Sequence, residues 1–307
     1  MQYSLILLKQ VIIMFAIICV GIGCYKTKLI AKEGEKYFSS LLLKIVSPIF
    51  IFTSYQTDFS AELLKGLAAS FSLSVISHIL MIVISNILIR KNEKYEYSIE
   101  RFSLVYTNCG FMGIPLAEGV FGAEGVLYAT AYVTVFNFLT WSHGLSVIKG
   151  EFSKKEILNV LKSPVIISIT LGVVFYILNI RLPEIIEQPL EYIGSMNTPL
   201  AMIVSGITIA QSNFLNIIKN KRIFMTVFFR LILIPLIIIP LMCFIPANKI
   251  AYMTVMLSVC APSATIGILF AVEHDKNAVY ASEIFAVSTI LSAITMPLML
   301  SYMSVFS

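Results

Sequence analysis

The chain has 307 residues, of which 58% are hydrophobic and 13% are charged, whereas soluble domains have roughly 45–50% and about 25%. A soluble core cannot bury that much apolar surface, so the composition predicts an all-α integral membrane protein and excludes an ordinary soluble domain. The formal net charge is +5, but the basic residues are scattered over short loops, which argues against a nucleic-acid partner.

Apolar runs of about 20 residues, enough to cross a bilayer, follow one another along the chain with short polar gaps between them. The first run has no basic start and is followed by nine more, so we interpret it as a membrane span and not as a signal peptide. The ten predicted spans are 3–25, 37–56, 63–89, 102–121, 125–148, 161–179, 190–212, 223–245, 250–271 and 278–303.

The loop charges predict an orientation. Loops after odd-numbered spans hold 16 Lys and Arg residues, and loops after even-numbered spans hold three. Because cytoplasmic loops retain Lys and Arg, we place the odd-span loops in the cytoplasm and both termini outside, in a multi-pass protein of the cell (inner or plasma) membrane. The 16 are Lys26, Lys28, Lys32, Lys36, Arg90, Lys91, Lys94, Arg101, Lys149, Lys154, Lys155, Lys162, Lys219, Lys221, Arg222 and Lys276, and the three are Lys65, Arg181 and Lys249.

The two halves of the chain resemble each other at a fixed offset, as in many duplicated transporters. The collinear matches, 147 to 152 residues apart, are Gly21 with Gly172, Tyr25 with Tyr176, Pro48 with Pro199, Pro115 with Pro262, and Tyr128-Ala129 with Tyr280-Ala281. Residues 1–150 and 151–307 are therefore predicted to be two five-helix repeats, and an odd number of spans inverts the second repeat.

Two equivalent spans are predicted to be broken. The fourth contains Asn108-Cys109-Gly110-Phe111-Met112-Gly113-Ile114-Pro115, and the ninth contains Cys260-Ala261-Pro262-Ser263-Ala264-Thr265. Proline removes an amide donor and glycine admits unwound backbone, so both spans expose polar backbone at membrane depth. Binding sites of inverted-repeat transporters form where such helices meet. Either proline alone could instead be a simple kink, as we interpret Pro48 and Pro199.

The stretch from Asn108 to Trp141, NCGFMGIPLAEGVFGAEGVLYATAYVTVFNFLTW, resembles the signature of the auxin efflux carrier family of membrane transporters. NTPLAMIVSGITIA from Asn197 and APSAT from Ala261 resemble its second-half motifs. The resemblance implies ten helices with outside termini, crossing broken helices 4 and 9, a scaffold of helices 1, 2, 6 and 7, and a moving transport domain of helices 3–5 and 8–10. It also implies a homodimer. The short loop between helices 5 and 6 is like that of bacterial malate and malonate permease-like relatives, not of plant PIN-formed carriers.

The candidate substrate-binding residues gather at the two broken spans, and each has a structural alternative. Asn108 is suited to orient a carboxylate or coordinate a cation, or to hold unwound backbone. The small residues Gly110 and Gly113 allow either close approach of a ligand to the backbone or close packing of helices. Hydroxyls after Pro262 suit an anion at a half-helix start, or bonds to their own helix. The full set is Asn108, Gly110, Gly113, Pro115, Asn137, Arg230, Pro262, Ser263 and Thr265.

Charged residues inside spans are functional candidates by default. Arg230 is the first candidate for balancing a substrate charge, although a long side chain also snorkels. Lys9 and Lys44 lie near span ends and are interpreted as snorkelling. Three further groups have weaker signals: Asn137, His143 and His78 as a proton path or helix-bridging partners, Glu118 and Glu124 as entrance residues, and Glu273-His274-Asp275 as a loop and not a metal site.

The leading hypothesis is a secondary transporter that moves a small organic anion of the carboxylate class by elevator-like alternating access. A channel needs a polar pore stripe and a membrane enzyme needs paired acids, a metal cluster or a nucleophile and base, and neither pattern is present in the predicted spans. A receptor that binds without transport remains the other alternative. We expect no catalytic residues, metal or cofactor, and leave the coupling ion, proton or sodium, open.

Overall fold

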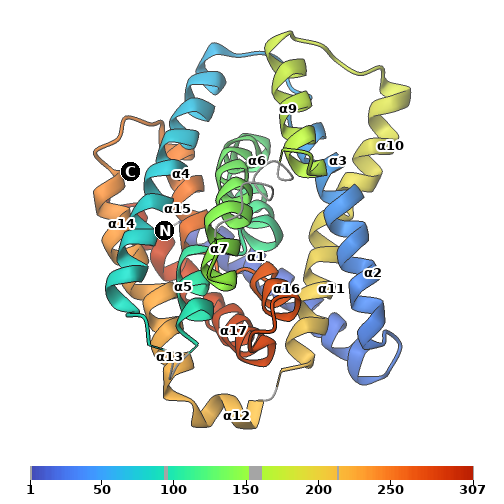
Figure 1. The fold of residues 1–307 in the computed structure, drawn as a ribbon. Helices are drawn as coiled ribbons and strands as arrows, with labels where there is room; N and C mark the ends of the chain where they lie inside the picture. The colour runs from blue at the N-terminus through green and yellow to red at the C-terminus, as the bar shows by residue number, and fades with distance from the viewer. Residues whose placement is uncertain (1, 93–95, 152–160, 213, 307) are drawn as a thin grey trace.

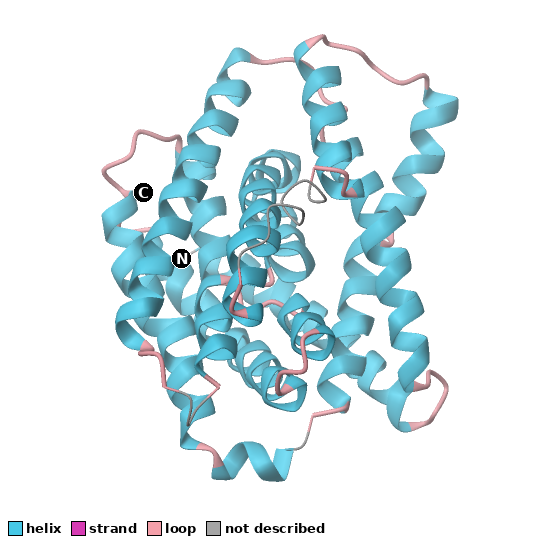
Figure 2. Cartoon of the chain, in the orientation of Figure 1, coloured by secondary structure: helices cyan, strands magenta, loops and turns pink. Residues whose placement is uncertain are grey.

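The computed structural model describes residues 2–92, 96–151, 161–212 and 214–306. Within these ranges every regular element is a helix (Figure 2). The only β-type contact among the described residues is one isolated antiparallel bridge between Thr107 and Ser263. Lys94, Lys154 and Lys155, which contribute to the predicted charge asymmetry, lie outside the described residues, as does part of the boundary between the predicted repeats.

The first half of the chain contains α1, α2, a π-helical turn η1, α3, α4, α5, a second π-turn η2, α6, a third π-turn η3 and α7. Their bounds are α1 Gln2–Lys26, α2 Lys32–Leu41, η1 Leu42–Val46, α3 Ser47–Thr53, α4 Ala61–Leu88, α5 Tyr97–Val105, η2 Cys109–Gly113, α6 Ile114–Leu139, η3 Thr140–Gly144 and α7 Leu145–Lys149.

The second half contains α9 to α17, with one further π-turn, η4. Their bounds are α9 Pro164–Ile177, α10 Glu184–Ser195, α11 Asn197–Ala210, α12 Phe214–Lys219, α13 Lys221–Phe228, η4 Phe229–Leu233, α14 Ile234–Met242, α15 Lys249–Cys260, α16 Ile266–Glu273 and α17 Ala278–Met303.

Among the described residues, seven helical runs are long and apolar enough to cross a membrane, and Pro164–Ile177 and Lys249–Cys260 are shorter apolar helices. The longest run, Cys109–Lys149, has 41 residues. At 1.5 Å per residue it would measure roughly 60 Å, about twice the ~30 Å hydrocarbon core of a bilayer. It is divided at Gly122, whose φ of 65° and ψ of −152° are not helical. The break lies between the predicted spans 102–121 and 125–148.

Three predicted boundaries need correction. The second predicted span begins at residue 37, but α2 begins at Lys32. The fourth predicted span begins at residue 102, but α5 begins at Tyr97 and includes the charged Glu100, whose carboxylate is paired inside the protein. The seventh begins at 190, but α10 begins at Glu184, directly after the extended Pro183. A break at Met196 separates α10 from α11, three residues before Pro199. In each case a charged residue or a proline directly before the predicted start made the predicted span begin inside the helix and not at its first residue.

Helices α1 and α11 cross at very short range, and α6 runs through the middle of the bundle (Figure 1). A Cβ atom added to Gly21 would lie 2.3 Å from the Ile203 carbonyl oxygen, and one added to Gly206 would lie 2.2 Å from the Ile18 carbonyl oxygen. A Cβ at Gly172 of α9 would similarly meet the Tyr55 ring at 2.5 Å. Small residues let membrane helices approach closely because only packing holds them together in lipid.

Gly21→Ala is expected to lower the free energy of unfolding by about 1–3 kcal/mol, because the obstructing atoms belong to the α11 backbone and cannot turn aside. Thermal unfolding in detergent measures the change. Gly23→Ala is the matched control, because a Cβ there meets no atom within 4 Å and alanine favours the helix. If the two variants were equally stable, the close crossing of α1 and α11 would be contradicted.

Candidate functional site

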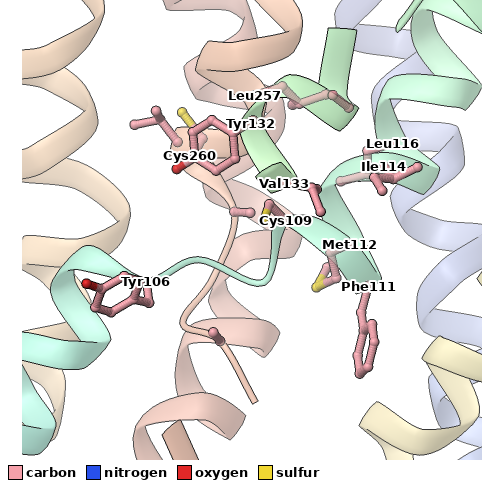
Figure 3. Close-up of a cluster of buried hydrophobic side chains, with 14 of the residues drawn as sticks. Tyr106, Cys109, Phe111, Met112, Ile114, Leu116, Tyr132, Val133, Leu257 and Cys260 are labelled. Atoms are coloured by element: carbon pink, nitrogen blue, oxygen red, sulfur yellow. The ribbon is translucent and has the colours of Figure 1, made fainter. Parts of the chain in front are cut away.

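The chain crosses itself at the two interruptions. The Asn108 amide donates to the Pro262 carbonyl oxygen at 2.7 Å, and the Ala264 amide donates to the Tyr106 carbonyl oxygen at 3.0 Å. Thr107 and Ser263 form the isolated antiparallel bridge between these bonds. In Figure 3 the extended chain from Tyr106 to Cys109 passes the extended chain that follows Cys260. We refer to residues 106–108 and 261–265 as the crossing.

Local backbone chemistry explains why α15 stops here. Ala261 precedes a proline, which disfavours the helical region, and it adopts an extended ψ of 151°. Tyr106 is likewise extended, with a ψ of 119°. The C-terminal ends of α5 and α15 therefore meet at the crossing, and η2 and α16 begin beyond it. Interrupted helices leave carbonyl and amide groups without intrahelical partners.

Asn108 has an unused donor. The residue is only 5% exposed, and its backbone carbonyl oxygen accepts the amides of Met112 at 2.9 Å and Gly113 at 3.2 Å. The backbone of Asn108 therefore starts the π-turn η2. Its side-chain Nδ2, in contrast, has no hydrogen-bond partner among the described residues. An unsatisfied buried amide is costly, so a native one calls for an explanation such as a ligand or water.

The two glycines of η2 have different surroundings. A Cβ at Gly110 would meet no atom within 4 Å, so there is open space beside it. Gly113 packs against Cys109 and against Ser258 of α15, where a Cβ would lie 3.5 Å from Oγ. Pro115 is buried two residues after the end of η2, and its missing amide removes one backbone hydrogen bond from this helical run. Of these residues, Gly110 has the geometry of a ligand contact and Gly113 that of a packing position.

The two hydroxyl residues after Pro262 have different surroundings. Ser263 is buried, its Oγ donates to the Ser103 carbonyl oxygen at 3.2 Å, and its amide donates to Ser288 Oγ at 3.2 Å. Thr265 is half-buried and is the residue directly before α16, and its side chain makes no capping hydrogen bond. Ser263 thus ties the crossing to α5 and α17, while Thr265 borders the start of a helix.

Arg230 lies in the π-turn η4 and is fully buried. All five of its N–H groups have acceptors. Nε donates to the Ala261 carbonyl oxygen at 3.2 Å, Nη1 donates to the Leu104 carbonyl oxygen at 3.0 Å and to Met81 Sδ at 3.5 Å, and Nη2 donates to the carbonyl oxygens of Ala261 at 2.8 Å and of Val259. The structure brings this residue to the crossing, directed at backbone carbonyl groups.

The other predicted polar residues are less closely connected to the crossing. Asn137 is half-buried in α6, and its Nδ2 donates to Val133 of its own helix at 2.8 Å. His143 Nδ1 lies 2.8 Å from the Tyr106 hydroxyl, so it contacts the residue that begins the crossing. His78 bonds Ser74 of its own helix at 2.8 Å through Nδ1, and its ring lies 4.7 Å from that of Tyr132.

Lys9 and Lys44 are exposed on α1 and η1.

All five cysteines are free thiols, and the described residues contain no group of three His, Cys, Asp or Glu side chains that could hold a metal ion. Two surface hollows of about 390 and 440 Å³ are lined by residues at the end of α1 and at the end of α4, not by the crossing.

The crossing faces a second group of helices. The π-turn η2 packs against α11, and α6 and α17 pack against α1. Because α1 and α11 also pack on each other, they form a wall beside the candidate site. The π-turn η2, which contains Gly110, and α6 therefore lie between this wall and α15.

A buried charge cluster was not found from the sequence. Glu100 of α5 is fully buried and accepts two hydrogen bonds from Arg222, one of them from Nη2 at 2.7 Å, and one from the Tyr280 hydroxyl at 2.8 Å. At the start of α15, Asn248 Nδ2 donates to the Tyr128 hydroxyl at 2.9 Å. The sequence signal that could have indicated these contacts was the repeat match between Tyr128 and Tyr280. Each of these tyrosines forms a hydrogen bond near the start of an interrupted helix in the other half of the chain.

Glu100→Ala is expected to destabilise the protein by about 3 kcal/mol, because it removes the carboxylate that holds the mostly buried Arg222. Thermal unfolding in detergent measures it. Asp58→Ala removes the exposed pair with Arg181, whose side chains are 97% and 39% exposed, and no measurable change is expected there. Equal effects of the two variants would contradict a structural role for the buried pair.

Seven apolar helical runs long enough to cross a bilayer, arranged around an interrupted-helix crossing, define a multi-pass membrane protein. The sequence matches the profile of the membrane transport protein family over residues 6–159 and 150–300. The chain therefore belongs to this family, the auxin efflux carrier family whose motifs surround Asn108, Asn197 and Ala261.

Two archaeal relatives carry the name uncharacterized transporter. One, from Methanothermobacter thermautotrophicus, is 27% identical over 193 residues, which cover 62% of this chain and 63% of the relative. The other, from Methanocaldococcus jannaschii, is 24% identical over 210 residues, which cover 65% of this chain and 68% of the relative. The chain thus spans slightly less than two thirds of the first relative's length.

Proposed function

We propose that the protein is a secondary transporter of a small organic anion of the carboxylate class, working by elevator-like alternating access. The observation that carries the proposal is the Nδ2 group of Asn108, a buried donor without a partner among the described residues, beside the open space at Gly110. Membership of a membrane transport family and the names of the two relatives support transport as the activity.

The charge of the ligand is inferred from helix ends. The helical run of η2 and α6 begins directly after Asn108, and α16 begins directly after Thr265. The N-terminal end of a helix carries about +0.5 of an elementary charge and unpaired amide groups, which favour an anion. An amide N–H from Asn108 complements a carboxylate oxygen. These features together favour a small carboxylate between the two helix starts.

The proposed architecture is ten spans in two inverted repeats, 1–150 and 151–307. It is supported by contacts between residues separated by the repeat offset. Ser47 donates to Asn197 Oδ1 at 2.7 Å across 150 positions, and Arg230 contacts Met81 across 149. In a pseudo-twofold arrangement, residues near the axis contact their own equivalents. The reciprocal tyrosine contacts of Tyr280 with Glu100 and of Tyr128 with Asn248 follow the same symmetry.

In the proposed mechanism α1, the α2–α3 span, α9 and the α10–α11 span form the scaffold. The remaining helices carry the crossing as a transport domain. The packing of η2 on α11 supports a site at the boundary between the two groups, where a sliding motion would expose it to either side in turn. The proposed orientation, with both termini outside the cytoplasm, is supported by the loop charges.

Uptake by proteoliposomes tests the proposal. The purified protein is reconstituted and offered labelled mono- and dicarboxylates together with matched neutral analogues, with and without proton or sodium gradients. Saturable uptake of a carboxylate supports the proposal, and the gradient that drives it identifies the coupling ion. Electrical conductance without saturation would indicate a channel, and binding without uptake would indicate a receptor; either result would contradict active transport.

A further inference from the structure

The fully buried Arg230 connects the ends of both interrupted helices. Leu104 belongs to the last turn of α5, Val259 belongs to the last turn of α15, and Ala261 follows α15 directly. The guanidinium donates to the carbonyl oxygens of all three. These are the acceptors that a helix leaves unpaired at its C-terminus. In a membrane core, water is not available to satisfy them.

The charges balance. The C-terminal end of a helix carries about −0.5 of an elementary charge, so two such ends together carry about −1, which one guanidinium neutralises. A buried cation without a negative partner is strongly disfavoured. The partial negative charges of the two helix ends stabilise the buried guanidinium of Arg230. Arginine fits this position better than lysine, because its planar fork presents five donors to separate acceptors.

We infer that Arg230 is a positioning residue that neutralises the C-terminal ends of α5 and α15, so that the crossing presents only the positive starts of η2 and α16 to a ligand. On this reading Arg230 sets the preference for anions without touching the substrate. The preference for anions rests on the proposed transport function, whereas the neutralisation of the helix ends does not.

The position of the charge suggests a direct test. Met81 of α4 lies 149 positions before Arg230, within the repeat offset, and its sulfur contacts the guanidinium. If the charge acts on the crossing and not on one specific contact, an arginine at position 81 should replace the one at 230. The variants to compare are Arg230→Met, Arg230→Lys, Met81→Arg and the double variant Met81→Arg with Arg230→Met.

The readout is already present in the chain. Cys109 and Cys260 flank the crossing and are buried, so their reaction with a maleimide reports its opening once Cys19, Cys24 and Cys243 are replaced by serine. Arg230→Met is expected to speed labelling by about tenfold or more and to lower the unfolding temperature, because the helix ends lose their counter-charge. Arg230→Lys should fall between Arg230→Met and the wild type, and the double variant should restore slow labelling.

Each outcome of these experiments either supports or overturns the inference about Arg230. Unchanged labelling and unfolding in Arg230→Met would overturn the inference. The inference would also be overturned if the double variant labelled as fast and unfolded at as low a temperature as Arg230→Met. If Arg230→Met does not fold, a double variant that also fails to fold would overturn it. Uptake of the carboxylate found for the wild type, relative to its neutral analogue, tests the anion preference: the double variant should retain it, and a folded double variant that takes up both equally would refute that part. A wild type that transports no carboxylate refutes the proposed function, and the labelling result still stands.

Discussion

Asn108→Ala is expected to weaken carboxylate uptake strongly while leaving the protein folded. The Nδ2 group donates to no acceptor among the described residues, so its loss orphans no partner. A hydrogen bond from this amide to a charged carboxylate contributes about 1.5–3 kcal/mol. That free energy corresponds to a decrease in affinity of about 10- to 150-fold. Saturable uptake by proteoliposomes and thermal unfolding of the same preparation measure the two effects separately.

Two further variants sharpen this prediction. Asn108→Asp keeps the size of the side chain but places a negative charge beside the site, so uptake of an anion should fall at least as far as in Asn108→Ala. Asn86→Ala is the matched control, because Asn86 also lies in a long apolar helix but is exposed and donates to Ile82 of its own helix at 2.8 Å. Normal uptake by a correctly inserted Asn108→Ala variant would remove Asn108 from the binding site.

The interruption of the ninth predicted span could be predicted because its cause, Pro262, is local. In the fourth predicted span the expected position was wrong: the chain leaves the helix at residues 106–108, whereas Gly110 and Gly113 lie in the π-turn η2 and Pro115 lies in the first turn of α6, so the glycines and the proline follow the interruption. The contact between the two breaks joins Asn108 to Pro262 across 154 positions. Composition and periodicity carry no direct information on such a pairing. It was expected only from the repeat and the family resemblance.

Arg230 shows the limit of reasoning from residue type. A charged residue at membrane depth is correctly recognised as unusual, and a substrate is then the natural partner to suggest. Four of its five hydrogen bonds go to backbone carbonyl groups, which every sequence position possesses, so no residue pattern distinguishes these acceptors. Glu100 was missed for a related reason. Its partner Arg222 is 122 positions away, and an unpaired glutamate near a span boundary is normally assigned to the loop.

Cross-linking α11 to α17 is expected to stop transport completely and reversibly. Ser212, just after α11, donates to the carbonyl oxygen of Ser282 in α17 at 3.3 Å. In the proposed mechanism α11 belongs to the scaffold and α17 to the moving domain, so a covalent link between them prevents the motion. The experiment uses Ser212→Cys with Ser282→Cys in a cysteine-free background and a short methanethiosulfonate cross-linker. Uptake should return when a reductant cleaves the link.

A second pair separates this loss from general damage by the reagent. Ser47 and Asn197 are in direct contact at 2.7 Å, and both belong to the proposed scaffold. Linking Ser47→Cys to Asn197→Cys joins two parts of one rigid body, so uptake should persist. Because the two pairs differ chiefly in whether the link crosses the proposed boundary, they distinguish sliding of the transport domain from any mechanism confined to the crossing. Persistent uptake through a fully linked 212–282 pair would contradict a moving α17 and favour a fixed pathway.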